Sequence, residues 1–375
     1  MMRTHRWSYF VLTALMAVAI AGCEGEQGPA GPAGAMGAAG PAGPAGPAGP
    51  IGPAGADANE NCTQCHVNDM TLYAKQIQLA VAKHGAPAGP SGENFDNDGQ
   101  YVRDSGECAV CHSHQGFLDR LETGEWAYSQ NDGVVSDAMP INCRTCHQIH
   151  TTYTDSDYAF TAMDPVAFRV AGVSVDLGDA GNLCATCHQS RIRSGQMAVI
   201  DGPDVTFTSS HYGPHGSPQG DMFAGVGFYD FEGGNGGPFA HAVDPRSRGC
   251  PTCHMVDAPG QDTGGHTFNP NAAGCETCHS SGDFDLFGGQ TTVQGLIDDL
   301  GALLDAAGIA HFDVDDGEWH PVPGTYPANT VAALWNFFGA VNDGSLGVHN
   351  PAYIKALLEG SIAELGGAAL VADKD

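Results

Sequence analysis

The chain has 375 residues, of which 43 are acidic and 14 are basic, and its formal net charge is −29 at pH 7. A surface of this charge repels nucleic acid and anionic lipid, so the composition excludes a nucleic-acid-binding protein and favours cationic or metal-bearing partners. The solubility of an exported protein would also account for the acidity, and this alternative stays open.

Residues 1–22 have the features of an export signal. Arg3 and Arg6 precede an apolar run over 10–21, which is shorter than the about 20 residues that span a membrane. Small residues then lead to Cys23, as in a lipoprotein signal peptide, and residues 20–23 resemble the bacterial lipobox. We therefore predict lipidation at Cys23 and an exported outer-membrane lipoprotein, at the cell surface or on the periplasmic face. An ordinary signal peptide with a chance cysteine is the alternative.

Residues 23–57 comprise the lipidated cysteine and a collagen-like stalk. Glycine stands at every third position from Gly25 to Gly55, often as Gly-Pro-Ala. Proline fixes its backbone angle, so the tract favours polyproline II geometry and would span roughly 100 Å. A triple helix that trimerises the protein and a single-chain spacer both fit. We favour the spacer, because so few triplets make a marginal triple helix.

Six copies of Cys-x-x-Cys-His follow, and each is typical of a c-type haem attachment site. The two cysteines form thioethers to one haem and the histidine ligates its iron. Zinc sites also use Cys-x-x-Cys pairs, but they do not need a histidine directly after the second cysteine. The motifs use 12 of the 13 cysteines, and Cys23 is the remaining one. The cysteines are Cys62, Cys65, Cys108, Cys111, Cys143, Cys146, Cys184, Cys187, Cys250, Cys253, Cys275 and Cys278, and the proximal histidines are His66, His112, His147, His188, His254 and His279.

The segment 58–290 is predicted to be the hexahaem domain, with six haem c groups as cofactors. Turn-forming residues are frequent in it and long apolar periodic stretches are few, so the haems are expected to replace much of the usual core. We expect a mainly irregular fold with short α-helices, little β-structure and a haem core. Residues 70–83 are predicted as one longer helix, and the glycine-rich segment 213–237 as loop.

The last segment, 291–375, has no attachment motif and is predicted to be helical. Apolar residues recur at helical spacing over 293–306 and 331–341. Asn350 and Pro351 form an N-cap followed by proline at the first helical position, so a third helix should run to about residue 365. We expect this segment to pack on the haem domain and to supply a haem ligand.

Ten histidines remain beyond His5 and the motifs, which is enough for a second axial ligand on every iron. Two histidines per iron suit electron transfer, because no coordination position is open to substrate. His114 and His150 lie too close to their own motif to fold back onto it, and are placed to ligate a neighbouring haem. His241 and His266 each precede the next motif by nine residues. The candidate distal ligands are His114, His150, His211, His241, His266 and His349, with His84 and His215 in reserve.

With these motifs the chain resembles multihaem c-type cytochromes of bacterial outer-membrane and extracellular electron transfer, including the hexahaem kind that forms filaments. The resemblance rests on the six motifs and on residues 143–150, 211–221 and 347–358. It implies a close-packed chain of haems with two histidines on each iron. The lipobox and the stalk depart from a released filament subunit and favour a tethered cytochrome.

The predicted function is therefore electron transfer without catalysis. Its partners would be other redox proteins or cytochromes and extracellular metal acceptors, with a membrane contact through the lipid anchor. A homo-oligomer, either a trimer through the collagen-like tract or a haem filament, stays open. The alternative is a multihaem reductase with one open haem, acting on a small oxyanion. A structural filament or adhesin would explain the stalk but not six redox centres. The acidic stretches 96–99 and 313–318 do not match an EF-hand loop and are interpreted as solvated loops.

Overall fold

The computed structural model describes residues 70–85, 106–191, 204–244, 249–257, 263–276, 278–279, 284–285 and 288–366. All of them belong to one compact unit, Gly55–Asp375. The predictions for the signal peptide, Cys23 and the collagen-like tract lie outside the described residues. The first attachment motif, with Cys62, Cys65 and His66, also lies outside them.

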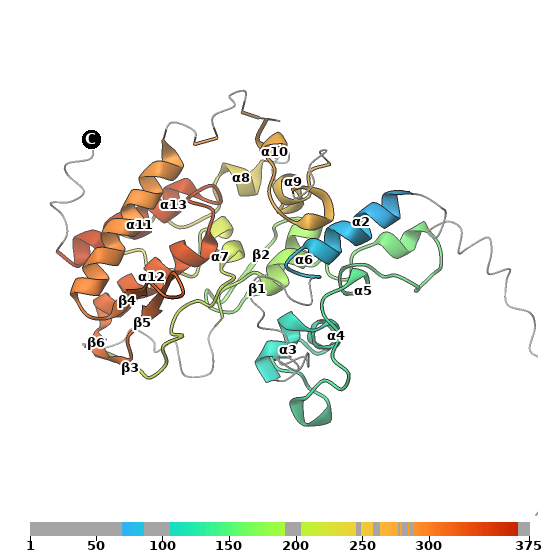
Figure 1. Cartoon of the computed structure of the whole chain (residues 1–375), viewed down its shortest axis with the longest axis horizontal. Helices are drawn as coiled ribbons and strands as arrows, with labels where there is room; N and C mark the ends of the chain where they lie inside the picture. Colours follow the sequence, from blue (N-terminus) through green and yellow to red (C-terminus); the bar gives the residue numbers. More distant parts are fainter. Residues whose placement is uncertain are drawn as a thin grey trace, which may run out of the picture. The chain divides into compact units, whose positions relative to one another are not determined.

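The part of the unit before residue 288 consists mainly of short helices joined by loops (Figure 1). Helix α2 (Met70–Val81) agrees with the helix predicted over 70–83. Short 3₁₀ turns, η1 (Asn131–Gly133), η2 (Asp155–Tyr158) and η3 (Gly265–Thr267), interrupt the loops. The other helices are α3 (Gly106–His112), α4 (His114–Thr123), α5 (Cys143–Cys146), α6 (Asp179–Cys187), α7 (Gln219–Ala224), α8 (Ala240–Val243), α9 (Pro251–His254) and α10 (Ala272–Glu276).

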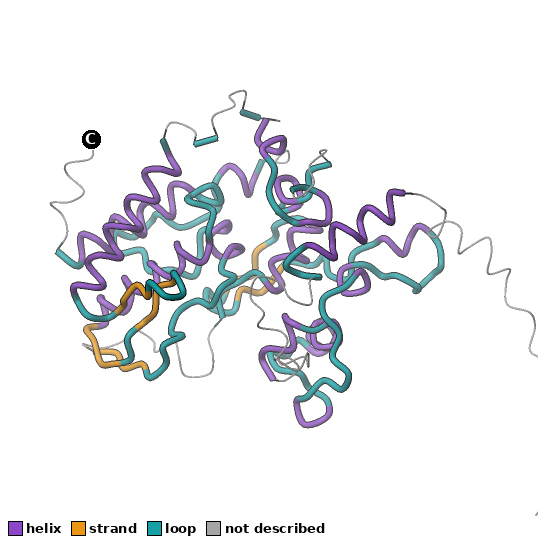
Figure 2. The backbone as a smooth tube through the Cα atoms, in the orientation of Figure 1, coloured by secondary structure: helices purple, strands orange, loops and turns teal. Residues whose placement is uncertain are grey.

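Strands are few and short, as Figure 2 shows in orange. They form three separate antiparallel pairs: β1 (Val166–Phe168) with β2 (Val173–Val175), β3 (Asp204–Phe207) with β6 (Gly324–Pro327), and β4 (Ala310–Asp313) with β5 (Glu318–Pro321). The described chain is thus helix-rich with little sheet, which confirms the predicted fold class at this level.

The largest apolar core lies among three helices near the C-terminus. These are α11 (Gly289–Ala306), α12 (Ala328–Asp343) and α13 (Pro351–Glu364), and they confirm the three helices predicted there. Leu300, Trp335 and Leu358 are fully buried between them. The Asn350 side chain accepts a hydrogen bond from the Tyr353 amide at 3.2 Å, the N-cap expected from the sequence.

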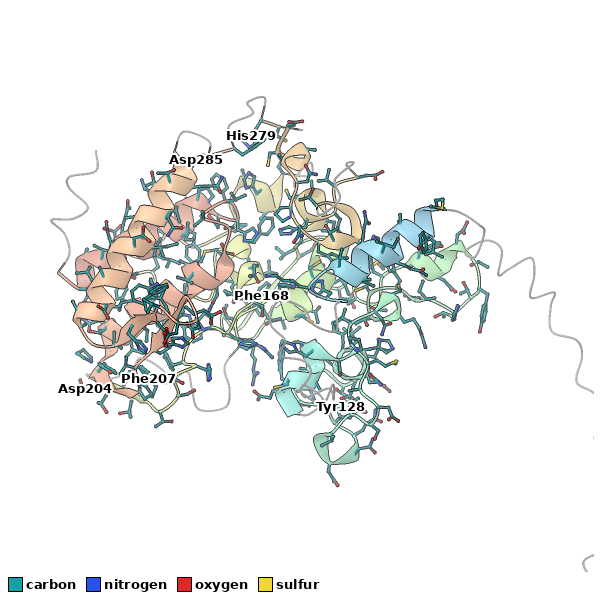
Figure 3. All side chains as sticks on the ribbon, viewed as in Figure 1. Tyr128, Phe168, Asp204, Phe207, His279 and Asp285 are labelled. Carbon is teal, nitrogen blue, oxygen red and sulfur yellow. The ribbon has the colours of Figure 1, made fainter. Side chains whose placement is uncertain are left out.

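Apolar clusters near the attachment motifs are much smaller. One gathers around Phe168 and Leu177, and another contains Ala109, Tyr128 and Val135. Figure 3 labels one residue of each cluster, with Phe207 for the C-terminal core. Most regular packing in the described unit is therefore found in its C-terminal part, away from the cysteines.

The prediction that 213–237 is entirely loop was wrong. Gln219–Ala224 forms helix α7, in which Met222 is fully buried in the main core. Gly225, at φ 69°, adopts the left-handed conformation that ends the helix. The glycines of this segment therefore lie in the loops and also at the end of a short helix. Helix α7 has only six residues, too few for its apolar residues to repeat at helical spacing.

The three C-terminal helices contact the segment 204–244 at several points. Gln219 Nε2 donates to the Asn342 carbonyl at 2.8 Å, and Asn350 Nδ2 donates to the Gly237 carbonyl at 3.0 Å. Strand β3 of this segment pairs with β6, which precedes α12. Among the described residues, the helices are all too short or too polar to cross a lipid bilayer.

Candidate haem-binding sites

Each described attachment motif contains a closed helical turn. In four motifs the backbone N–H of the histidine donates to the carbonyl of the first cysteine, at 2.8 to 3.0 Å. The second motif lies within helix α3, which ends at His112. Such a turn brings both cysteines and the histidine close together. The ten described motif cysteines are free thiols, as thioether formation requires, so these residues fit a covalently bound haem.

Every described motif histidine faces a second histidine that lies outside the motifs. The separations between ring centres range from 5.8 to 6.4 Å. The pairs are His112 with His215, His147 with His266, His188 with His84, His254 with His349, and His279 with His241.

This separation is the one expected for two imidazoles on opposite sides of one iron. With a metal–nitrogen bond of about 2.0 Å on each side and about 1.1 Å from nitrogen to ring centre, the two ring centres lie about 6.2 Å apart. Two imidazoles joined by a direct hydrogen bond would be roughly 1 Å closer. The five separations are compatible with axial ligation, and they also fall within the range of ordinary aromatic contacts, roughly 4.5–7 Å.

Hydrogen bonds at Nδ1 orient several of these rings. Nδ1 of His147 and of His254 lies 2.6 and 2.9 Å from backbone carbonyls of Tyr158 and Phe268. Nδ1 of His241 lies 2.7 Å from the Val348 carbonyl. A carbonyl can only accept, so the proton is on Nδ1 and Nε2 is left with its lone pair. This is the tautomer that a metal-binding imidazole needs, with its orientation fixed by the outer hydrogen bond.

The His254–His349 pair has a different outer partner. His349 Nδ1 lies 2.6 Å from Asp343 Oδ1, and the Asp343 side chain is fully buried. Asp343 Oδ2 also accepts a short hydrogen bond from the Ser345 hydroxyl. Burial lowers the pKa of His349, but the Asp343 carboxylate outweighs this and the pKa is raised. A buried carboxylate therefore places negative charge beside this pair.

Burial lowers the pKa of two other paired imidazoles, His84 and His266. Desolvation, with smaller contributions from His188 and His112, lowers the pKa of His84 to about 4. Desolvation, with Lys75 and His147, also lowers the pKa of His266 to about 4. Neutral imidazole is the form that binds a metal ion, so at neutral pH these rings are ready to ligate without first losing a proton.

The sequence-predicted distal ligands divide into two groups in the structure. His241, His266 and His349 lie opposite motif histidines, and so do the two reserve residues, His84 and His215. The remaining candidates are His114, His150 and His211. The motif histidine His66 lies outside the described residues, so its surroundings are not described.

The three remaining candidates differ in their environment. His114 is buried and its Nδ1 lies 3.0 Å from Thr145 Oγ1. His150 is exposed, has a positive φ of 67° and stacks on the Tyr153 ring. His211 is exposed, and its amide donates to Ser209 Oγ.

The nine-residue offset that drew attention to His241 and His266 does not set their pairing. His241 faces His279 of the sixth motif rather than the fifth motif that follows it. His266 faces His147 of the third motif rather than the sixth. Each of these histidines therefore precedes one motif in the sequence but faces the histidine of a different motif in the structure.

Attachment motifs also lie beside one another. Arg191, three residues after the fourth motif, donates from Nη1 to the carbonyl of Glu107, the residue before the second motif, at 3.4 Å. The fourth and fifth motifs also lie close together, since a Cβ added at Gly181 would be 3.7 Å from the Cys250 amide nitrogen. A Cβ added at Gly181 in helix α6 would lie only 3.1 Å from Gly249 Cα, so glycine permits this close approach.

Sequence reasoning missed the residues that orient the imidazoles. Besides Asp343 and Thr145, these include Gln219, whose Oε1 lies 3.1 Å from His188 Nδ1. The available signal for Asp343 was its position six residues before His349, at the end of helix α12 and two residues before Ser345. For Gln219 and the backbone carbonyls, the sequence carries no local signal, because the contact is made across the fold.

Part of the chain is similar to outer-membrane cytochromes. Residues 53–199 match the family model of the outer membrane cytochrome MtrC/MtrF-like domains II/IV. This match covers the first four attachment motifs and supports the resemblance to multihaem c-type cytochromes of extracellular electron transfer. The chain is also similar to a solved structure, that of the outer cell wall cytochrome OcwA, at 17% identity and a TM-score of 0.49. That alignment covers 78% of this chain and 50% of the other, so this chain spans about half of its length. No curated protein matches the chain.

Proposed function

We propose that this protein is an electron carrier that passes electrons along six covalently bound c-type haems, each iron held by two histidines. The observation that carries the proposal is the set of five histidine pairs at the separation expected for an intervening iron. Each haem supplies one-electron exchange between ferric and ferrous iron. The protein holds the rings, fixes their tautomers and keeps both axial positions closed to other ligands.

The proposed axial partners follow from the pairs. The irons of the second to the sixth motif would be held, in that order, by His215, His266, His84, His349 and His241. The iron of the first motif takes its second ligand from the remaining candidates, His114, His150 or His211. Substituting each of these three by alanine tests the choice, because one substitution should open exactly one haem and the other two none.

The proposed electron path branches at the fourth motif. Residues beside it contact the second and the fifth motif: Arg191 Nη1 donates to the Glu107 carbonyl at 3.4 Å, and a Cβ added at Gly181 would lie 3.7 Å from the Cys250 amide nitrogen. The fifth motif is in turn close to the sixth, since a Cβ added at Gly274, the residue before Cys275, would lie 3.2 Å from Cys253 Cα. Attached porphyrin edges would be brought together at these points, where electrons pass most readily.

The proposed location is the outside of the cell envelope. The family match to an outer membrane cytochrome supports export and envelope association. We further propose a lipid anchor at Cys23 and the collagen-like tract as a spacer that holds the haem domain off the membrane. The strongly acidic chain would favour cationic redox partners or metal-bearing acceptors at this position.

Haem spin state tests the proposed ligation. The purified holoprotein should contain six haems per chain, all low-spin by electron paramagnetic resonance and absorbance. His84→Ala should convert one haem to a high-spin form that binds cyanide, because its iron loses one axial ligand. His311→Ala is the matched control, since this exposed histidine lies on the β4–β5 hairpin and pairs with His320.

Two results would contradict the proposal. If His84→Ala left six low-spin haems, the pairing of His84 with His188 would not represent ligation. If the unsubstituted protein contained a high-spin haem that binds nitrite or cyanide, the multihaem reductase would become the better interpretation.

A further inference from the structure

The β4–β5 hairpin gathers ligand-type side chains on one face. Successive residues of a strand point to opposite sides, so His311 and Asp313 share one face of β4 and Glu318 and His320 share one face of β5. The register pairs His311 with His320 and Asp313 with Glu318. Phe312 and Trp319 alternate with these residues and pair with each other at 5.6 Å between ring centres.

The opposite face of the hairpin is anchored to the core. Trp319 packs against Phe337 with ring centres 5.1 Å apart, and Phe337 is fully buried. The indole ring also fills the space beside Gly301 of helix α11. The ligand-type face is therefore held outward by packing on a rigid part of the fold, rather than carried on a free loop.

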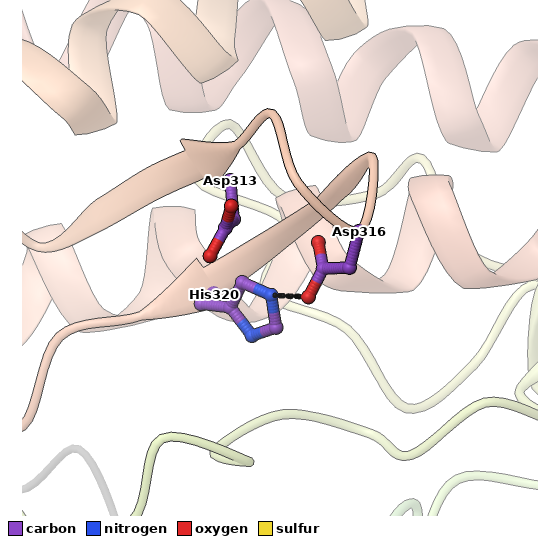
Figure 4. Close-up of side chains that lie close together, drawn as sticks. All are labelled: Asp313, Asp316 and His320. Carbon is purple, nitrogen blue, oxygen red and sulfur yellow. Dashed lines mark hydrogen bonds and ion pairs between the residues drawn. The ribbon is translucent and has the colours of Figure 1, made fainter.

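Two aspartates converge on His320 from this face. Asp316 Oδ2 lies 2.8 Å from His320 Nε2, and Asp313 has a carboxylate oxygen within 4.8 Å of both groups (Figure 4). Backbone amides orient the two carboxylates: the Asp315 amide donates to Asp313 Oδ1 and the Glu318 amide donates to Asp316 Oδ1. The second oxygen of Asp316 is thereby directed at His320, and a metal ion between the two would replace their hydrogen bond.

His311 supplies a fourth group beside this cluster. Its ring centre lies 5.6 Å from that of His320, across the two strands. Residues 311–320 also contain Asp315 and Glu318 but no lysine or arginine. The stretch therefore combines two imidazoles with uncompensated negative charge, which a bound cation would offset.

We propose that Asp313, Asp316, His320 and His311 form a binding site for a divalent transition-metal ion such as Zn²⁺, separate from the haems. Mixed imidazole and carboxylate ligands favour such ions over Ca²⁺, which prefers oxygen alone. In a tetrahedral zinc site, neighbouring ligand atoms are roughly 3.3 Å apart. Asp316 and His320 need to separate only slightly from their present hydrogen bond, which side-chain rotation provides.

This site replaces the interpretation of residues 313–318 as a solvated loop. The two histidines it uses are outside the five pairs with motif histidines, so it does not compete with the proposed haem ligation. The proposed metal site is a property separate from electron transfer. Metal binding at the hairpin can be tested whether or not the proposed haem ligation is correct.

Equilibrium dialysis of the haem-loaded full chain against Zn²⁺ in excess Ca²⁺ tests the proposal. The amount of bound zinc should be about one ion per chain, with zinc and haem iron both measured by mass spectrometry and the iron used to count chains. His320→Gln and Asp316→Asn should each weaken zinc binding at least tenfold, and His311→Gln should weaken it less. Asp298→Asn, an exposed acid on helix α11, is the matched control and should bind zinc like the unsubstituted protein.

A thermal measurement separates loss of the site from loss of the fold. Zinc should raise the unfolding midpoint of the unsubstituted protein and of Asp298→Asn, but not that of His320→Gln, while all three should have the same midpoint without zinc. Equal zinc binding by His320→Gln and the unsubstituted protein would overturn the assignment. Complete displacement of zinc by Ca²⁺ would also overturn it, because it would indicate an oxygen-only acidic surface.

Discussion

Asp343→Asn should raise the redox potential of one haem, the one attached at the fifth motif. Asp343 is fully buried and its carboxylate lies 2.6 Å from Nδ1 of His349, which faces His254. A carboxylate at this position stabilises ferric iron, which carries one more positive charge than ferrous iron. Asparagine retains an oxygen that can accept the hydrogen bond but removes the charge, so the substitution isolates the electrostatic effect.

The geometry sets the size of the effect. An iron bound at Nε2 of His349 would lie roughly 6 to 7 Å from Asp343 Oδ1, allowing about 2.0 Å for the metal bond. At an effective dielectric constant of about 20, one charge at that distance contributes about 2.5 kcal/mol. Since 100 mV corresponds to about 2.3 kcal/mol per electron, the potential should rise by on the order of 100 mV.

Spectroelectrochemical titration with electron paramagnetic resonance measures the individual potentials. Asp316→Asn is the matched control, because Asp316 also bonds a histidine, His320, but at the β4–β5 hairpin and not at an attachment motif. The control should leave all haem potentials unchanged. A fall in potential for Asp343→Asn, or six unchanged potentials, would refute the assignment of His349 as a ligand or of Asp343 as the charge that tunes it.

Three further predictions concern packing, pH and anchoring. Gly181→Ala should destabilise the fold by about 1–3 kcal/mol in denaturant titrations, because its Cβ would crowd Gly249, whereas Gly216→Ala, with open space around it, should change stability little. Burial raises the pKa of Asp221 from 3.8 to about 7, despite a hydrogen bond donated by the Ser190 amide. The folded state therefore holds an extra proton between these values, and stability should fall as pH rises from about 4 to 7. Asp221→Asn should remove this pH dependence, and an unchanged slope would show that another group causes it. Cys23→Ser should move the protein from the membrane fraction to the soluble fraction of cells, and persistent membrane association would exclude lipidation as the anchor.

The chemistry of the cofactor could be predicted from sequence because it is local. Two thiols and an imidazole must meet one haem, and a single helical turn such as Cys143 to His147 brings them together with no help from the rest of the fold. The C-terminal helices were predictable for a similar reason. Their apolar spacing and the cap at Asn350 are properties of short stretches of chain.

The pairing of histidines was not local, and the sequence reasoning reached it only in part. His349 and His266 were chosen from their surroundings, but nothing near His84 indicated that it faces His188. The equal offsets before the fifth and sixth motifs marked His241 and His266 as candidate ligands without assigning either to a motif, and the structure places them opposite His279 and His147. Such a partner is selected by the path of the whole chain, which no window of sequence contains.

The sequence by itself thus determined the number of attachment motifs, the acidic character of the chain and the positions of the longer helices. Only the tertiary structure decided which imidazoles face each other, which motifs touch and which carboxylate lies beside His349. The physical reason is the separation along the chain between the residues that interact. Thioether attachment and helix capping involve residues within one or two helical turns. The facing histidines, the contacts between motifs and the burial of Asp343 depend on distant segments that meet only in the complete fold.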